Sequence, residues 1–175
     1  MADIVELSSA DAGPFRAHRL RALETDPGAF PGSLASYQDE MLSLTGQYLA
    51  RLAGSTDDLL LGAKIDSLVG TLGLARETVP KLRHKATLWG MYVIPERRRL
   101  GIGKLLLQEL LARIERRMPG LAQIHAWVTV GENHPRKLLE QFGFRVLCVE
   151  PRALRIDGKY FDRAHLLRES EAARS

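Results

Sequence analysis

Apolar residues in this chain recur with two different spacings, which alternate along the sequence. Runs of adjacent or alternating apolar residues predict β-strands near residues 4–7, 59–65, 68–74, 86–94, 124–130, 144–149 and 160–167. Apolar residues three or four positions apart predict helices near residues 14–24, 36–53, 101–118 and 136–142. Strands mixed with helices in this order predict an α/β fold with one mostly antiparallel sheet of six or seven strands, covered by about four helices.

Short polar segments mark the expected turns between these elements. Asp66-Ser67 separates two apolar runs and predicts an antiparallel hairpin, and Asp157-Gly158 predicts a second turn before the last strand. The basic segment 76–85 is expected to be a solvated connection in front of the central strand. The first hairpin therefore predicts that the strands from the N-terminal half of the chain pair antiparallel.

The composition fits one folded domain. The chain has 175 residues, of which 45% are hydrophobic and 26% charged, with a net charge of +4. A single domain over residues 1–170 with a frayed tail over 171–175 is therefore expected. The modest positive charge suits an anionic cofactor and does not indicate nucleic acid.

Cysteine usage and the N-terminus indicate a reducing, non-membrane environment. Cys148 is the only cysteine, which excludes an intrachain disulfide and a zinc site of several thiolates, so no metal is expected. We expect Cys148 to be a buried core thiol, because it lies in an apolar strand. No segment has the pattern of a signal peptide or the length to cross a bilayer, so a cytoplasmic location is expected.

The most informative stretch follows the central strand. Pro95 ends the strand, three consecutive arginines follow it, and Gly101 and Gly103 precede an amphipathic helix. Free N–H groups at the start of a helix carry partial positive charge, and glycine lets an anion approach them closely. The stretch therefore predicts an anion site suited to phosphate.

The glycine spacing excludes two common phosphate loops. A nucleotide P-loop needs Ser or Thr after Gly-Lys, whereas Leu105 follows Gly103-Lys104. A dinucleotide fingerprint needs a small residue at position 106, which is Leu106. The remaining pattern is Arg98-x-x-Gly101-x-Gly103.

This pattern, after a strand ending in Tyr92-Val93-Ile94-Pro95, resembles the pyrophosphate loop of the GNAT superfamily of acyl-CoA-dependent N-acyltransferases. Phe142-Gly143-Phe144 stands about where that family places a Gly-Phe pair, and the resemblance extends from Arg19 to Asp162. It implies acetyl-CoA as cofactor and two central strands, near 88–94 and 124–130, that splay apart around the pantetheine arm. Unpaired backbone groups in that opening would be satisfied by the cofactor.

By the same resemblance, backbone groups of Tyr92 and Val93 would hold the pantetheine or the thioester carbonyl, and the amides from Arg98 to Lys104 the pyrophosphate. Arg97 or Arg99 would reach the adenosine phosphate. The cofactor-binding residues implied are Met91, Tyr92, Val93, Arg98, Arg99, Leu100, Gly101, Ile102, Gly103, Lys104 and Asn133.

The implied reaction is direct attack of a neutral amine on the thioester, through a tetrahedral intermediate stabilised by strand amides. Leu139 stands where many relatives carry the tyrosine that protonates the thiolate. Tyr92 and His134 are the alternative acids, unless the thiolate leaves unprotonated. Glu132 and His134 are the candidate bases, because the central strand has no carboxylate.

The acceptor implied is a primary amine of a small molecule or peptide, shaped by a flap over residues 26–40 and a hairpin near 152–162. Phe30 and Tyr160 are the candidate substrate contacts, although Phe30 also suits the core. A non-catalytic acyl-CoA sensor of the same fold is the alternative, and a nucleic-acid-binding domain is disfavoured by the glycine spacing and the few aromatics. Dimers are common in such families, so a homodimer is one expected state.

Overall fold

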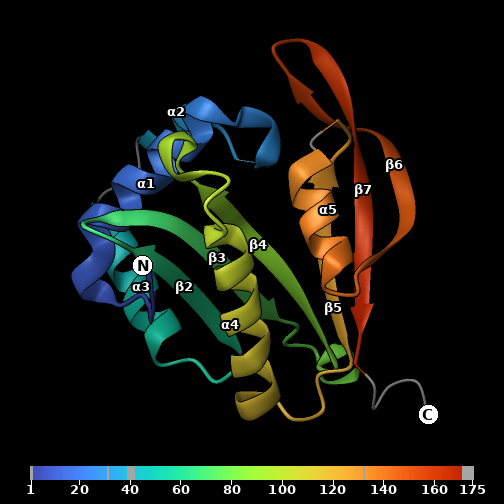
Figure 1. The fold of residues 1–175 in the computed structure, drawn as a ribbon, viewed down its shortest axis with the longest axis horizontal. Coiled ribbons are helices and arrows are strands. Elements are labelled where there is room, and N and C mark those ends of the chain that lie inside the picture. Colours follow the sequence, from blue (N-terminus) through green and yellow to red (C-terminus); the bar gives the residue numbers. More distant parts are fainter. Residues whose placement is uncertain (1, 31, 39–41, 132, 171–175) are drawn as a thin grey trace.

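One seven-stranded sheet forms the centre of the protein (Figure 1). The computed structural model describes residues 2–30, 32–38, 42–131 and 133–170. The strands lie in the order β1-β2-β3-β4-β5-β7-β6, and only the β4–β5 pair is parallel. The predicted mixed, mostly antiparallel sheet is confirmed. The bounds are β1 Asp3–Glu6, β2 Asp58–Lys64, β3 Leu68–Arg76, β4 Lys85–Val93, β5 Gln123–Thr129, β6 Arg145–Ile156 and β7 Lys159–Glu169.

Helices cover both faces of this sheet, with α4 and α5 in front and α1 and α3 behind in the view of Figure 1. Among the described residues, no helix is both long enough and apolar enough to span a membrane. The bounds are α1 Ala12–Thr25, α2 Leu34–Gln38, α3 Leu42–Ala53, α4 Ile102–Arg117 and α5 Asn133–Gln141.

Strand β2 shows why the apolar runs are unbroken. Leu59 and Leu61 belong to the core on the α4 side, whereas Leu60 belongs to the core formed with α1 and α3. Side chains alternate between the faces of a strand, so a strand covered on both faces needs apolar residues at every position. All three leucines are fully buried, at 0–1% exposure.

Three element boundaries differ from the sequence predictions. The single helix expected over 36–53 is two helices, α2 and α3, separated by residues 39–41, which lie outside the described residues. Helix α5 begins at Asn133, upstream of the predicted residue 136. Pro135 fits this first turn, because residues there need no backbone donor. Strand β6 extends to Ile156, where Asp157 and Gly158, both with positive φ, form the tight hairpin turn to β7.

The prediction that Cys148 is a buried thiol is wrong. Cys148 is exposed, and so are Leu147 and Val149 beside it. These residues lie on β6, one of the two edge strands of the described sheet, which pairs only with β7. An edge strand lacks the second neighbour and the covering helix that bury an internal strand, so its apolar residues remain partly in water.

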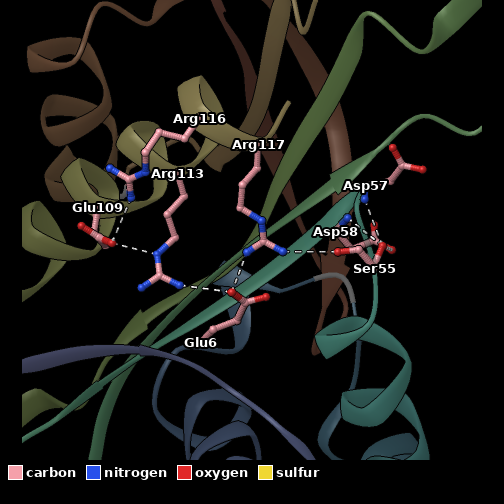
Figure 2. A network of polar contacts seen from close by, with 8 residues as sticks. All are labelled: Glu6, Ser55, Asp57, Asp58, Glu109, Arg113, Arg116 and Arg117. Carbon is pink, nitrogen blue, oxygen red and sulfur yellow. Dashed lines mark hydrogen bonds and ion pairs between the residues drawn. The ribbon is translucent and has the colours of Figure 1, made fainter. Parts of the chain in front are cut away.

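A polar network fixes the C-terminal half of α4 against the rest of the protein (Figure 2). Glu6 of β1 accepts from Arg113 at 3.1 Å and from Arg117 at 2.6 Å, and Arg113 also donates to Glu109. Arg117 reaches the backbone carbonyl of Ser55 as well. The network connects the C-terminal half of α4 to strand β1 at one edge of the sheet and to the segment before β2.

Candidate active site

Strand β4 carries a bulge close to its end. Thr71 of β3 pairs with Tyr92 and Gly73 pairs with Trp89, so two residues of β4 stand opposite one residue of β3. Gly90 within this bulge has φ +63°, a conformation that favours glycine, and its carbonyl accepts from the Thr71 hydroxyl at 2.8 Å. Bulges bend and twist a strand, and this one lies where β4 turns away from β5.

Strands β4 and β5 pair at three positions only. The parallel ladder covers Lys85 to Thr87 of β4 and Gln123 to His125 of β5, and beyond it the two strands diverge (Figure 1). A cavity of about 710 Å³ occupies the opening. Its walls include β4 from Thr87 to Val93, β5 from Ala126 to Thr129, the loop before α4 and the start of α5. The backbone edge that β4 would otherwise offer to β5 therefore faces a cavity.

The loop between β4 and α4 forms one end of this cavity. Arg99 and Gly101 both have positive φ, at +62° and +78°, and Gly101 is the N-cap of α4. Four cationic side chains, Arg97, Arg98, Arg99 and Lys104, line the cavity together with Gly101, Ile102 and Gly103. An anion here would meet the free amides and the positive end of a 16-residue helix.

Arg98 makes contacts of its own within the protein. Its Nε donates to the Val93 carbonyl at 2.9 Å, and its Nη2 lies 2.5 Å from Oδ2 of Asp26. Asp26 follows helix α1 and belongs to the predicted flap. Arg98 therefore joins the loop to the flap, and its charge is partly compensated before any ligand binds.

Tyr92 lies beneath the flap. Its side chain is 5% exposed, its hydroxyl lies 2.9 Å from the Thr25 hydroxyl, and its ring meets those of His18 and Phe30 edge-on. Phe30 is also 5% exposed and carries the Arg19 guanidinium 4.3 Å above its ring. Both aromatic residues line the cavity, so each serves the core and the site at once.

His18 is buried behind Tyr92 on α1. Neither ring nitrogen makes a hydrogen bond to a described residue. Burial lowers the pKa of His18 to about 4; backbone groups of Leu68 and Tyr92 oppose that shift, and the charges of Arg21 and Arg19 reinforce it. His18 is thus a neutral packing residue near neutral pH.

Most of the predicted site residues line one cavity. Leu100 and Tyr160 do not line it: Leu100 is 61% exposed, and Tyr160 is 57% exposed in the β6–β7 hairpin. Glu132 lies outside the described residues, as does the side chain of Asn133, whose backbone begins α5. The predicted residues that line the cavity are Phe30, Met91, Tyr92, Val93, Arg98, Arg99, Gly101, Ile102, Gly103, Lys104 and His134.

Helix α5 supplies the opposite wall. His134 is exposed at its start, and Pro135, Leu138 and Leu139 line the cavity behind it. Leu139 is 2% exposed and belongs to the core, so a side chain at this position is held rigidly. As a leucine, it cannot donate a proton.

The sequence interpretation did not name Asp26, Thr129 or Arg163 as site residues, and it favoured a packing role for Trp127; all four line the cavity. A signal for two of them was present. Ile124, Ala126 and Val128 alternate as the buried face of β5, which places Trp127 and Thr129 on the other face. Asp26 and Arg163 gave no local signal, because their partners lie far away in the chain.

A comparison with protein families agrees with this geometry. The family model described as "Acetyltransferase (GNAT) family" matches residues 18–144, which is more than half of the chain. The match includes the flap, the bulge, the loop before α4 and helix α5. A search among curated proteins found no match.

Solved structures of similar fold cover nearly the whole chain. An acetyltransferase of the GNAT family from Streptococcus pneumoniae has a TM-score of 0.87 and 21% identity, over 97% of this chain and 100% of that one. Ribosomal-protein-alanine N-acetyltransferase from Brucella melitensis has a TM-score of 0.83 and 21% identity, over 96% and 99%. Phosphinothricin acetyltransferase from Sinorhizobium meliloti has a TM-score of 0.82 and 18% identity, over 96% and 88%. At such identities these likenesses show a shared fold.

Proposed function

The chain belongs to the GNAT family of acetyltransferases, enzymes that use acetyl-CoA as acetyl donor, and from this premise we propose that it acetylates a primary amine of a small molecule or peptide. The observation that carries the proposal is the single cavity that joins the loop before α4, the β4 bulge and the flap. Two neighbours of similar fold support the acceptor class by their names, which specify a ribosomal-protein alanine and phosphinothricin. The neighbour from Sinorhizobium meliloti was solved with acetyl-CoA.

The residues present fit acetyl-CoA. The ligand needs a pyrophosphate site, and the loop offers free amides at a helix start beside Arg97, Arg99 and Lys104. It also needs a narrow polar-edged slot, which the unpaired part of β4 provides. We assign pyrophosphate binding to the loop from Arg98 to Lys104 and pantetheine binding to the backbone of Met91, Tyr92 and Val93.

The chain's own groups then account for the chemistry. Bound acetyl-CoA would supply an acetyl thioester, which an amine can attack only as the neutral base. Gly90 and Met91 have no pairing partner on β3, so their backbone N–H groups would be available to stabilise a developing oxyanion. Phe30 of the flap and Tyr92 of β4 restrict water on the acceptor side.

We assign proton transfer from the amine to His134. It lines the cavity with an exposed side chain, whereas the Tyr92 hydroxyl already has Thr25 as partner. His134→Gln is expected to lower kcat by about 100-fold and to leave the Kd for acetyl-CoA unchanged. Tyr92→Phe, its control, is expected to keep most of the wild-type kcat. An unchanged kcat in His134→Gln would assign the base elsewhere.

The cofactor assignment is tested by calorimetric titration with acetyl-CoA. Arg98→Glu is expected to raise Kd at least tenfold, because it places a negative charge in the loop and repels Asp26. Asp26→Asn breaks the same ion pair and leaves the loop charge intact, so about a threefold rise is expected. Free CoA should bind like acetyl-CoA, and ATP should not bind. Unchanged acetyl-CoA affinity in Arg98→Glu would exclude this loop as the phosphate site.

A non-catalytic acyl-CoA-binding module is the second candidate, and Leu139 is the observation that favours it. A buried leucine replaces the proton-donating tyrosine of many relatives. Acetyl-CoA binding without thiol release across a broad amine panel would support this alternative. A single domain over 1–170, a homodimer and a cytoplasmic location stay predictions.

A further inference from the structure

Arg163 lies on the cavity wall, on the face of the sheet opposite α4. It stands on β7, directly across from Thr129 of β5, and it lines the same cavity as Gly90 and Met91 of the bulge. Its neighbours Ala164 and Leu166 are buried in the core shared with α4. Because side chains alternate along a strand, Arg163 points to the other face, away from the loop assigned to pyrophosphate.

The guanidinium of Arg163 lacks the acidic partner that a partly buried cation normally has. Its Nε is buried and makes no hydrogen bond to a described residue, and Glu150, which stands opposite it on β6, forms no salt bridge with the group. Burial lowers the pKa of Arg163, and the charge of Glu150, its neighbour on β6, opposes the shift. Burying a charge without an opposite charge costs free energy, unless a bound ligand supplies that opposite charge.

An aromatic stack holds this guanidinium in place. Its Cζ atom lies 5.5 Å from the centre of the Trp127 ring, and Trp127 stacks on His165 at 4.2 Å with an angle of 8° between the rings. A planar cation over a tryptophan face is favourable and leaves its edge free for a second contact. Arg163 is therefore positioned before any acceptor arrives.

The other charges of the cavity do not favour a purely cationic acceptor. Asp26 is the only carboxylate among the described residues that line it, and it already accepts from Arg98 and Thr25. The aromatic residues Phe30 and Trp127 also line the cavity. The acceptor half of the cavity thus combines apolar walls with two guanidinium groups: that of Arg19, which lies over Phe30, and that of Arg163, which forms no salt bridge to a described carboxylate.

We propose that the acceptor is an amine that also carries a carboxylate, as a free amino acid does, and that Arg163 binds this carboxylate. The inference rests on the proposed acetyl transfer and narrows its acceptor class. A peptide N-terminus has an amide at the corresponding position, which would leave the Arg163 guanidinium unpaired. A guanidinium binds a carboxylate with two parallel hydrogen bonds, so discrimination between acid and amide is expected to be strong.

The test compares free acids, primary amides and decarboxylated amines built on the side chains of leucine, methionine and phenylalanine. Thiol release from acetyl-CoA gives kcat/KM, and calorimetric titration of the CoA-loaded protein gives the affinity of each compound without turnover. We expect the acids to exceed their amides at least tenfold in both quantities. The α-amine of an amino-acid amide is a weaker base than that of the free acid, so a larger fraction of it is neutral and able to attack. This difference favours the amides, so a faster rate with the acids cannot result from it.

Variants of Arg163 test whether this residue causes the preference for acids. Arg163→Gln is expected to abolish the preference for the acids and to leave acetyl-CoA affinity unchanged, and Arg163→Lys should keep part of it. Arg155→Gln is the matched control, because Arg155 also lies over an aromatic ring of this hairpin, that of Tyr160, but outside the cavity. It should behave like the wild type.

The outcomes separate the two proposals. Acetylation of amides and simple amines at rates equal to those of the acids would overturn the carboxylate inference and leave acetyl transfer standing. A preference for acids that survives in Arg163→Gln would also overturn it. Thiol release with none of these compounds would count against the proposed acetyl transfer, and the titration would still decide the inference, because acids that bind no better than amides would contradict it.

Discussion

Replacing Gly103 by valine is expected to weaken acetyl-CoA binding about 100-fold, which corresponds to about 2.7 kcal/mol. A Cβ atom at this position would lie 3.3 Å from Leu138 and 3.5 Å from Met91, in the space between the start of α4 and the cavity wall. A phosphate can approach helix amides closely only where no side chain stands in front of them. Calorimetric titration with acetyl-CoA measures the effect.

The folded state should tolerate this change. The atoms that a Cβ would meet are the ends of two flexible side chains, and Gly103 has no positive φ. Gly46→Val is the matched control, because Gly46 is also a helical glycine, in α3, outside the cavity. It should bind acetyl-CoA normally. Wild-type affinity in a folded Gly103→Val variant would contradict the assignment of the loop to pyrophosphate.

Acidification from pH 6.5 to pH 4 is expected to cost the protein about 3 kcal/mol of unfolding free energy through His18 alone. The pKa of His18 is about 4 in the folded state, against 6.5 for an unperturbed histidine. Between these values the unfolded state binds more protons than the folded state, so stability falls as pH falls. Below pH 4 the loss is complete, and above pH 6.5 it is absent.

Urea unfolding at several pH values measures this dependence. His18→Leu removes the titrating group together with two buried nitrogens that make no hydrogen bond to a described residue. The variant should therefore be as stable as the wild type at pH 7 and lose less unfolding free energy on acidification. Burial also lowers the pKa of His125 and His165, so a smaller pH dependence should remain. An unchanged slope in His18→Leu would mean that His18 is not the group responsible.

The ion pair between Arg98 and Asp26 changes the role expected of Arg98 in the arginine cluster. From the sequence, Arg98 was a positive charge for the cofactor, whereas the structure gives it a carboxylate and a carbonyl inside the protein. Its neighbours Arg97, Arg99 and Lys104 also line the cavity and carry the remaining charge of the loop. Arg98 therefore couples the position of the flap to the loop that we assign to phosphate binding.

The elements that the sequence predicted well depend on residues close together in the chain. Pro95 ends β4, Gly101 adopts positive φ, and leucines at helical spacing form α4, which begins at Ile102 close to the predicted residue 101. The Asp66-Ser67 hairpin is equally local and has the predicted antiparallel pairing. Backbone preferences and hydrophobic periodicity among residues close together in the sequence specify each of these elements.

The predictions that failed concern how elements meet. An apolar run cannot show whether its strand lies inside the sheet or at its edge, which is why Cys148 was expected to be buried. A hairpin near the expected acceptor side likewise could not show that Tyr160 would lie outside the cavity and Arg163 on its wall.

The sequence by itself determined the family resemblance, the order of the elements and the glycine-rich helix start, because local backbone preferences specify them. Only the tertiary structure decided where β4 leaves β5, how Arg98 meets Asp26 across 72 positions, and how Arg163 comes to lie over Trp127. Those features depend on strand register and on packing between distant segments, which neither spacing nor composition encodes.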